Sequence, residues 1–221
     1  MTAAQSDNRV LIRQRGLCDY EPIWREMQAF TQRRQPDTPD EIWLLQHPPV
    51  FTLGRNTKPE HLLAPGEIPV VPIDRGGQVT YHGPGQLMVY TLVDLKRLGP
   101  GIREFVTRLE QAVIDLLGGY HIEAYGRRDA PGVYVDNAKI AALGLRVKQG
   151  CTYHGLALNI DMDLSPFLRI NPCGYAGMAV TQLRDLGISD SIETVSERFL
   201  AHLLANLGYN GRELPPGQSH E

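Results

Sequence analysis

The sequence lacks two features that mark nucleic-acid-binding and membrane proteins: an excess of positive charge and a long hydrophobic run. Its 221 residues carry 22 Lys and Arg against 25 Asp and Glu, so the formal net charge is −3. A chain without a basic field has nothing to attract a phosphate backbone. No apolar run approaches the ~18 residues of a membrane span, and the N-terminal segment MTAAQSDNRV has no apolar core of a signal peptide. We therefore expect a cytoplasmic protein with no nucleic-acid or membrane partner.

Cysteine is scarce, and its spacing argues against the usual structural uses. The three cysteines, Cys18, Cys151 and Cys173, form an odd set without a CxxC pair. This usage is typical of free thiols in a reducing compartment rather than of a disulfide framework. Cys151 and His154 have the C-x2-H spacing of two zinc ligands, but no second pair accompanies them, so we expect no metal site.

Sequence motifs of several familiar catalytic sites are also missing. The chain has no GxxxxGK[ST] phosphate loop and no GxGxxG dinucleotide fingerprint. It has neither HExxH nor GxSxG, the signatures of zinc peptidases and serine hydrolases. We expect no bound cofactor.

What is present is typical of one globular domain with mixed secondary structure. The apolar share is 42% and the charged share 21%, as in an ordinary soluble protein. We expect a single domain over residues 1–221, with a mobile tail after about residue 209. Hydrophobic spacing predicts helices at 19–34, 101–119 and 192–208, strands at 9–14, 41–46, 50–55, 68–74, 86–95 and 151–161, and a hairpin at 132–150. Strands joined by short turns, with few helices between them, favour the α+β class.

Some residues are expected to fix the ends and faces of these elements. Asp19 is a candidate N-cap of the first helix. Ile102 is expected to join Phe105 on the buried face of the second helix. The hairpin is expected to turn at Asp136 and Asn137.

The segment RGGQVTYHGPGQ at 75–86 contains more glycines than a surface turn needs. It interleaves four glycines with Arg75, His82 and other polar side chains. Glycine lets the backbone approach a ligand closely. His82 and His154 each precede a glycine, and each is either an acid/base group or a hydrogen-bonded structural residue.

Two further residues are candidates for covalent chemistry. In NPCGYAGM (171–178) Cys173 stands between a proline and a glycine, which suits an accessible nucleophile but also a small buried side chain. Lys139 stands among apolar residues of the predicted hairpin. A lysine there either points to solvent or, if drawn inward, acts as a base or stabilises a nearby thiolate.

Four sequence blocks together resemble the motif set of the lipoyl(octanoyl) transferases. They are RGGQVTYHGPGQLMVY (75–90), KIAALG (139–144), TYHGLALN (152–159) and NPCGYAGM (171–178). The likeness keeps its order over roughly residues 40 to 185, without a departure at any motif position. The resemblance implies an α+β domain like that of the biotin and lipoate protein ligases, with a mixed, largely antiparallel sheet flanked by helices.

The resemblance also implies an acyltransferase reaction and its site. An octanoyl group passes from octanoyl-acyl carrier protein to Cys173 as a thioester, and then to a lysine of a lipoyl domain of the 2-oxoacid dehydrogenases or of the glycine-cleavage H protein. Lys139 matches the catalytic lysine of the family. The implied substrate-binding residues are Arg75, Gly76, Gly77, Gln78, Val79, Thr80, Tyr81, His82, Ala142, Leu143, Gly144, Gly155, Leu156 and Ala157. We further expect a monomer.

Chemistry assigns tasks to parts of this site. The narrow tunnel for a straight C8 chain needs glycines along its wall, and we expect His82 at its mouth. Amides of the turns Gly76-Gly77 and Gly83-Pro84-Gly85 are candidates for holding the thioester oxyanion. Basic residues at 127–128, 146 and 148 are candidates for docking acidic protein substrates, with a merely solvated surface as the alternative.

Two rival functions differ from the transferase in definite features. An ATP-dependent lipoate or biotin ligase shares the fold and the lysine but needs no nucleophilic cysteine. A non-catalytic acyl-binding protein would keep the glycines and lose Cys173 or Lys139. This chain retains both residues, which favours the transferase.

Overall fold

The computed structural model describes residues 9–172 and 177–213, which form two β-sheets packed with α-helices. The strands are β1 (Arg9–Leu17), β2 (Asp40–Gln46), β3 (Val50–Leu53), β4 (Val70–Pro72), β5 (Val79–His82), β6 (Gln86–Leu92), β7 (Tyr125–Gly126), β8 (Gly132–Val135), β9 (Ala138–Lys148), β10 (Cys151–Asn159) and β11 (Gly211–Glu213). The α-helices are α1 (Tyr20–Arg33), α2 (Leu95–Leu98), α3 (Ile102–Gly119) and α4 (Ile192–Leu207), and short 3₁₀ helices span Pro59–His61, Ser165–Arg169 and Arg184–Leu186. The predicted long helices and most predicted strands are confirmed.

The larger sheet has the strand order β11-β1-β2-β6-β10-β9-β8-β7. Strand β1 is parallel to β11 and β2, and the remaining neighbours are antiparallel. Parallel neighbours cannot be joined by a tight turn, and α1 supplies the crossover between β1 and β2. The predicted α+β fold with a mixed, largely antiparallel sheet is confirmed.

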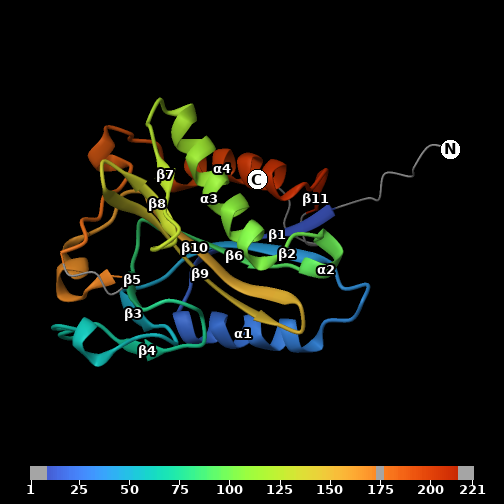
Figure 1. The fold of residues 1–221 in the computed structure, drawn as a ribbon, viewed down its shortest axis with the longest axis horizontal. Helices are drawn as coiled ribbons and strands as arrows, with labels where there is room; N and C mark the ends of the chain where they lie inside the picture. Colours follow the sequence, from blue (N-terminus) through green and yellow to red (C-terminus); the bar gives the residue numbers. More distant parts are fainter. Residues whose placement is uncertain (1–8, 173–176, 214–221) are drawn as a thin grey trace.

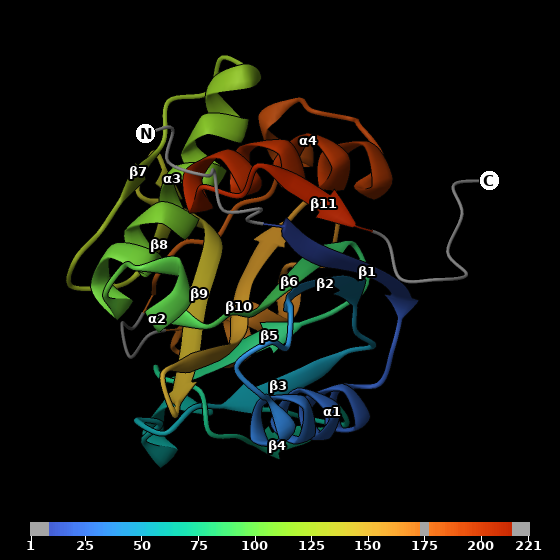
Figure 2. The same ribbon diagram turned by 90° about the vertical axis from the view of Figure 1, so that its right-hand side faces the viewer.

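The two faces of this sheet pack against different layers (Figures 1 and 2). Helices α3 and α4 cover one face, and α1 lies on the opposite side together with β3, β4 and β5. Successive side chains of a strand point to opposite faces. In β6, Leu87 and Val89 therefore join the core beneath α3 and α4, whereas Met88 and Tyr90 pack on the α1 side.

The helix starts differ from the sequence expectations at two positions. Asp19 occupies the N-cap position of α1, but its side chain makes no capping hydrogen bond. Ile102 is 39% exposed, because α3 turns its first residue outward and begins its buried stripe at Phe105. The cap of α4 does follow the rule, since the Ser191 side chain accepts a hydrogen bond from the Thr194 backbone N–H.

The predicted hairpin is confirmed in its turn as well as its strands. Asp136 and Asn137 separate β8 from β9, and both have positive φ, 46° and 66°. Two consecutive left-handed residues make the turn that matches the twist of antiparallel strands. Lys139 is the second residue of β9 after this turn, so the turn helps to fix its place in the sheet.

The sequence analysis did not predict the smaller sheet, which has the order β4-β3-β5. Its strand β5 comes from the glycine-rich segment, and β5 pairs antiparallel with β3. Phe51 and Tyr81 from this sheet pack with Phe167 in a separate hydrophobic cluster. Strand β5 of the small sheet supplies one wall of a space that residues of β6, β9 and β10 also line. Within the described ranges, no helix has the length and hydropathy needed to cross a membrane.

Candidate active site

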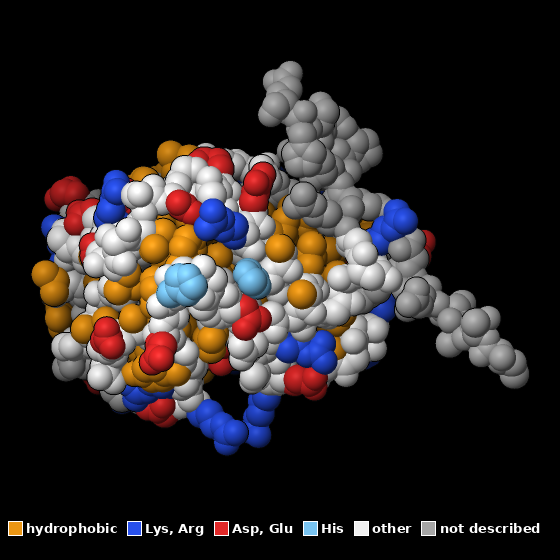
Figure 3. Space-filling model, turned by 90° about the horizontal axis from the view of Figure 1, so that it is seen from above, with side chains coloured by type: hydrophobic (Ala, Val, Ile, Leu, Met, Phe, Trp, Pro, Cys, Tyr) orange, Lys and Arg blue, Asp and Glu red, His pale blue; other side chains and the backbone are white. Residues whose placement is uncertain are grey.

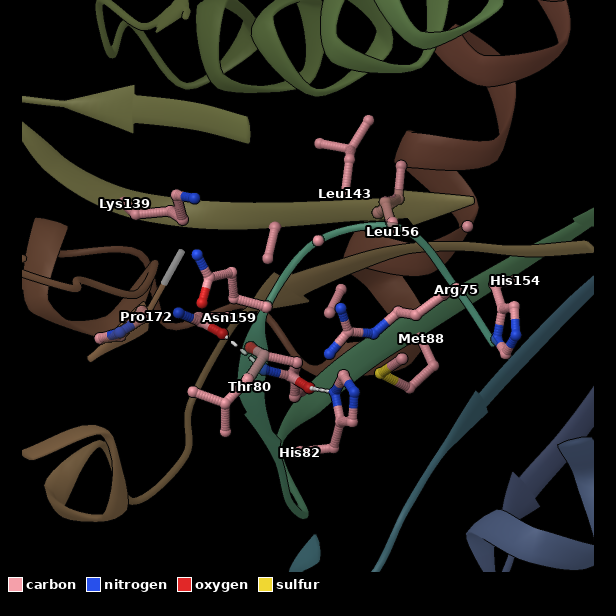
Figure 4. A pocket seen from close by; sticks show the side chains of 18 of the residues that line it. Arg75, Thr80, His82, Met88, Lys139, Leu143, His154, Leu156, Asn159 and Pro172 are labelled. Atoms are coloured by element: carbon pink, nitrogen blue, oxygen red, sulfur yellow. Dashed lines mark hydrogen bonds between the residues drawn. The ribbon is translucent and has the colours of Figure 1, made fainter. Parts of the chain in front are cut away.

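A cavity lies between the small-sheet side of the molecule and the α1 side of the large sheet (Figure 4). It encloses about 720 Å³ of space free of protein atoms, its mouth included. Its lining comprises Tyr20, Arg75, Gly77, Gln78, Val79, Thr80, His82, Gln86, Met88, Tyr90, Lys139, Ala142, Leu143, Gly144, His154, Gly155, Leu156, Ala157, Asn159, Phe167, Pro172 and Val180.

The floor of the cavity is made of four small residues on two neighbouring strands. Ala142 of β9 is paired with Ala157 of β10, and Gly144 is paired with Gly155. Directly opposed residues of an antiparallel pair point to the same face. Ala157 belongs to the α1-side cluster, so this small-residue floor faces the cavity. Space for a ligand exists here because none of the four side chains is larger than a methyl group.

Arg75 forms part of the opposite wall and is almost fully buried. Its Nη2 donates to the backbone O and Oγ1 of Thr52, both at 2.9 Å, and Nη1 donates to the Gly76 O at 2.9 Å. A Cβ added at Gly144 would lie 2.8 Å from the Arg75 Cδ, so the arginine stem runs directly over the floor. Glycine at 144 is needed for this close approach.

Lys139 is buried, with 3% of its surface exposed, and lines the same cavity. Its Nζ donates to the Pro131 O at 3.4 Å and stands 5.2 Å from the ring centre of Tyr134. Both a carbonyl and an aromatic face attract an ammonium group. A Cβ at Gly132 would lie 3.1 Å from the lysine Cε, so Gly132 leaves the room that the side chain occupies.

Backbone pairing holds Lys139 against the segment that follows the NPCGYAGM motif. The Lys139 N–H donates to Ala179 O at 2.8 Å, and the Thr181 N–H donates to Lys139 O at 3.0 Å. Cys173 lies outside the described residues. Pro172, the residue before it in the chain, lines the cavity that Lys139 lines. The segment after the cysteine motif is thus hydrogen-bonded to Lys139, and the residue before the cysteine lines the same cavity as the lysine.

A chain of buried hydrogen bonds runs along another wall (Figure 4). His82 Nδ1–H donates to Gln86 Oε1 at 2.8 Å, and the Gln86 amide donates to Asn159 Oδ1 at 2.8 Å. The Asn159 amide in turn donates to the Thr181 O at 2.9 Å, and the Thr52 hydroxyl lies 3.2 Å from His82 Nε2. His82 is only 4% exposed, so the expectation that it stands at the tunnel mouth is wrong.

The histidines near this wall are neutral at pH 7. Burial, with a smaller contribution from the neighbouring His47, lowers the pKa of His82 to about 3. Burial also lowers the pKa of His47 to about 4, against a hydrogen bond to the Cys18 carbonyl that favours protonation. These imidazoles therefore act as hydrogen-bonding groups and not as cations.

The expected oxyanion donors are partly engaged elsewhere. The Gly76 N–H donates to the Leu145 O at 3.0 Å, and the Gly85 N–H donates to the Gln46 Oε1 at 2.8 Å. These two amides are not available to a thioester oxygen, so the interpretation is wrong for Gly76 and Gly85. Gly85 instead permits a tight turn, because a Cβ there would lie 1.8 Å from the Asp161 O.

Most of the substrate-binding residues expected from the sequence do come together. Of the expected substrate-binding residues, every one lines the cavity except Gly76 and Tyr81. Tyr81 packs instead in the cluster with Phe51 and Phe167. Sequence reasoning missed Tyr20, Gln86, Met88, Tyr90, Asn159, Phe167, Pro172 and Val180 as lining residues. The alternation of β6 was a usable signal, because it places Gln86, Met88 and Tyr90 on one face.

The fold, a mixed sheet flanked by helices with a second small sheet beside it, is similar to that of solved lipoate and biotin protein ligases. A bipartite lipoate protein ligase from Thermoplasma acidophilum matches with a TM-score of 0.72 at 14% identity, over 96% of this chain and 88% of that one. A structure of lipoate-protein ligase A bound with ATP matches with a TM-score of 0.72 at 15% identity, over 97% of this chain and 90% of that one. A biotin protein ligase from Aquifex aeolicus matches with a TM-score of 0.56 at 12% identity, over 90% of this chain and 70% of that one. At such identities the likeness concerns the fold.

Sequence relatives narrow the class to one family. Residues 19–204 match the family model of the lipoyl protein ligase A/B catalytic domain. An octanoyltransferase of Thiobacillus denitrificans is 64% identical over 206 residues, 93% of this chain and 94% of the relative. An octanoyltransferase of Stutzerimonas stutzeri is 62% identical over 198 residues, 90% of each chain. The chain belongs to the octanoyltransferase family, and it is an acyltransferase.

Proposed function

We propose that this protein transfers an octanoyl group from octanoyl-acyl carrier protein to a lysine of a protein lipoyl domain, through a thioester on Cys173. The acceptors are the lipoyl domains of the 2-oxoacid dehydrogenases and the glycine-cleavage H protein. The observation that carries the proposal is a buried lysine, Lys139, in a narrow cavity that the neighbour of Cys173 also lines. The family membership supports octanoyl transfer in lipoate biosynthesis.

The first half of the reaction is a thioester exchange. The Cys173 thiolate attacks the carbonyl carbon of the octanoyl thioester, and the thiolate of the carrier leaves with its electron pair. A nearby ammonium stabilises both thiolates, which is the first task of Lys139. Because one thioester replaces another, the step needs no nucleotide.

The second half is aminolysis of the enzyme thioester. The acceptor lysine is mostly protonated at neutral pH and must lose a proton before it attacks. Lys139, once it has given its proton to the departing carrier thiolate, is a neutral amine that can take the proton of the acceptor. The Pro131 carbonyl and the Tyr134 ring stabilise the ammonium form of Lys139, which the first half of the reaction uses. In the proposed reaction the lysine alternates between its charged and neutral forms.

The small-residue floor suits the acyl chain. An unbranched C8 chain offers apolar surface and few polar groups, so its binding depends on close packing. The pairs Ala142–Ala157 and Gly144–Gly155 leave a slot of that shape beneath Arg75. We propose the cavity-lining members of the expected set as the acyl-binding residues, without Gly76 and Tyr81.

Two acidic protein substrates must reach one cavity, so we propose docking through local basic residues. The face that carries α3 and α4 mixes acidic, basic and apolar side chains (Figure 3), which does not favour it for docking. Arg127 already pairs with Asp129 at 2.5 Å. Arg146 and Lys148 on β9, the strand that carries Lys139, are the better candidates. We further propose a monomer, with residues 1–221 acting as one catalytic domain in the cytoplasm.

The deciding experiment offers two acyl sources to an apo lipoyl domain. One mixture contains octanoyl-acyl carrier protein and no nucleotide, and the other contains octanoate, ATP and magnesium. We expect amide formation, followed by intact-protein mass, in the first mixture only. A ligase would give the opposite pattern, because it must activate a free carboxylate. Product from octanoate and ATP with a Cys173→Ser variant would overturn the proposal.

A further inference from the structure

Glu110 of α3 is a half-buried carboxylate to which the proposed reaction assigns no task. Helix α3 packs against β7 and β8 (Figures 1 and 2), and Glu110 reaches from it to the turn before β8. Within the described ranges no Lys or Arg side chain forms an ion pair with this carboxylate. A carboxylate that leaves water needs other polar contacts to offset the loss of hydration, so its backbone contacts indicate its role.

The two oxygens of the Glu110 carboxylate meet the backbone at two points. The Gly132 N–H donates to Oε1 at 2.9 Å. A Cβ at Gly126 would lie 3.1 Å from Oε2, so the glycine at 126 leaves room for the carboxylate. Glu110 is therefore seated between β7 and the first residue of β8.

The N–H that Glu110 binds and the carbonyl that Lys139 contacts belong to one peptide group, the bond between Pro131 and Gly132. The Lys139 Nζ donates to the Pro131 O at 3.4 Å. The described residues contain no cis peptide bond, so the N–H and C=O of this group point in opposite directions. The peptide group thus stands between a carboxylate on one side and an ammonium group on the other.

This arrangement couples the charge of Glu110 to that of Lys139. Burial raises the pKa of Glu110, whereas the hydrogen bond from Gly132 and the positive charge of Lys139 lower it. Coupling between two sites is reciprocal, so the carboxylate favours the ammonium form of the lysine. The carboxylate also polarises the peptide group between them, which makes the Pro131 O a stronger acceptor.

The turn that carries this peptide group is held on its other side by Tyr134. The Tyr134 hydroxyl donates to the Ala130 O at 2.7 Å, and the side chain is fully buried. The same ring has its centre 5.2 Å from the Lys139 Nζ. Glu110 and Tyr134 together therefore fix the backbone that Lys139 contacts.

The charged residues that line the cavity are positive. Among the described lining residues Lys139 and Arg75 are cations, and none is acidic. Arg127 and Asp129, which precede the Pro131–Gly132 peptide, pair with each other at 2.5 Å. Glu110 does not line the cavity, so its carboxylate interacts with Lys139 from behind the wall and takes up no space that a substrate needs.

We propose that Glu110 is a positioning residue for Lys139: through the Pro131–Gly132 peptide it aims the carbonyl that holds the lysine and keeps the amine protonated until the carrier thiolate takes the proton. This inference rests on the proposed function, since it concerns the lysine of that reaction, and it adds a third group to the pair of Cys173 and Lys139. Glu110 acts through the lysine and touches no reacting atom.

The first test measures how readily Lys139 loses its proton in the free protein, without an acyl substrate. A neutral amine reacts with acetic anhydride and an ammonium does not, so the initial rate of Lys139 acetylation reports the neutral fraction. Peptide mass follows it, with Lys58, Lys96 and Lys148 as internal references. Glu110→Gln removes the charge and keeps an oxygen that can accept from the Gly132 N–H. We expect acetylation about threefold faster at each pH from 7 to 9, and an equal rate would overturn the proposal.

Glu104→Gln is the matched control for this test. Glu104 is also an acidic residue of α3, but it is exposed and pairs with Arg108 at 2.6 Å. We expect this variant to leave the acetylation rate of Lys139 unaltered. Faster acetylation in both variants would also contradict the proposal, because a general loss of negative charge would then account for it.

The second test separates position from charge during turnover. Glu110→Ala suits a helix but leaves the Gly132 N–H without its acceptor, whereas Glu110→Gln keeps that hydrogen bond. We expect kcat for octanoyl transfer to fall about tenfold in Glu110→Ala and about threefold in Glu110→Gln, with KM for the carrier protein within about twofold. An unaltered kcat in Glu110→Ala, or a loss confined to KM, would refute a role through Lys139.

The two proposals fail separately. Acetylation needs no acyl donor, so it decides the role of Glu110 even if the chain transfers another acyl group. Octanoyl turnover from carrier protein by the unaltered chain decides the transferase, whatever Glu110 does.

Discussion

Lys139 combines a charged side chain with 3% exposure, a combination that a surface-pointing strand residue does not have. Its sequence context of alanines and leucines left two interpretations open, solvated or drawn inward. The structure decides for the second: Lys139 is buried, and its backbone is paired with the segment that carries Ala179 and Thr181. A sequence cannot show such pairing, since the paired residues are about 40 positions away.

The role of Lys139 is testable with Lys139→Met, which removes the charge and keeps much of the bulk. We expect acyl transfer to fall at least ~100-fold, as on losing an acid/base group. Alkylation of Cys173 by a small electrophile should also move to higher pH, because the thiolate loses a neighbouring cation. The measurement is a pH series of alkylation followed by peptide mass. An unaltered alkylation profile would separate the lysine from the thiol.

The nucleophile is testable by labelling with octanoyl-carrier protein. The unaltered chain should gain one octanoyl mass, and Cys173→Ser should gain none, because an alcohol is far less ionised than a thiol. Cys151→Ser is the matched control. Cys151 is buried, and burial raises the pKa of its thiol, so it should not react. Labelling that depends on Cys151 and not on Cys173 would contradict the assignment.

At the scale of single elements, the long helices and the β8–β9 hairpin could be predicted and β5 could not. Buried apolar residues of α3 recur every three to four positions. The turn at Asp136 and Asn137 depends on the positive φ angles of these two residues, which is a local property. Strand β5 has only four residues between glycines, and it is held by pairing with β3, almost 30 positions earlier. Short strands of this kind depend on tertiary contacts rather than on local preference.

The cavity floor shows the same limit. Each small residue was identified in its own block of sequence, but the pairs Ala142–Ala157 and Gly144–Gly155 depend on the register of two strands. Tyr20, Met88 and Asn159 were missed for a related reason: each belongs to a different element, and only packing brings them to one cavity.

The turn into β8 provides an element-scale prediction. Gly132 has φ 150°, and a Cβ there would lie 2.7 Å from the Ala141 O and 3.1 Å from the Lys139 Cε. Gly132→Ala should therefore displace the lysine and lower acyl transfer at least ~10-fold beyond any loss of folded protein. Gly99→Ala is a matched control, because Gly99 also has positive φ but no neighbour within 4 Å. Equal activities of the two variants would count against the packing argument.

At the scale of the whole molecule, buried neutral histidines make stability depend on pH. The pKa of His82 falls from 6.5 to about 3 and that of His47 to about 4, chiefly through burial. Between those values and 6.5 the unfolded chain binds more protons than the folded one. Stability is therefore complete above about pH 6.5 and declines as the pH falls toward the folded pKa values.

The expected slope is up to about 1.4 kcal/mol per pH unit for each such histidine. Urea unfolding at pH 5, 6 and 7 measures it. His82→Gln should flatten the dependence, whereas His202→Gln on α4 should leave it unaltered. A free energy of unfolding that stays level from pH 7 to 5 would show that these imidazoles are not buried in neutral form.

The pairing of the first and last strands has a consequence for how the molecule avoids self-association. Arg9, Val10 and Leu11 of β1 are paired in parallel with residues 211–213 of β11. A chain shortened before Gly211 would leave that rim of β1 with unmatched amides and carbonyls, an open template for another strand. Strand β11 therefore adds no group to the cavity, but it occupies the part of the β1 rim at which another strand could otherwise pair.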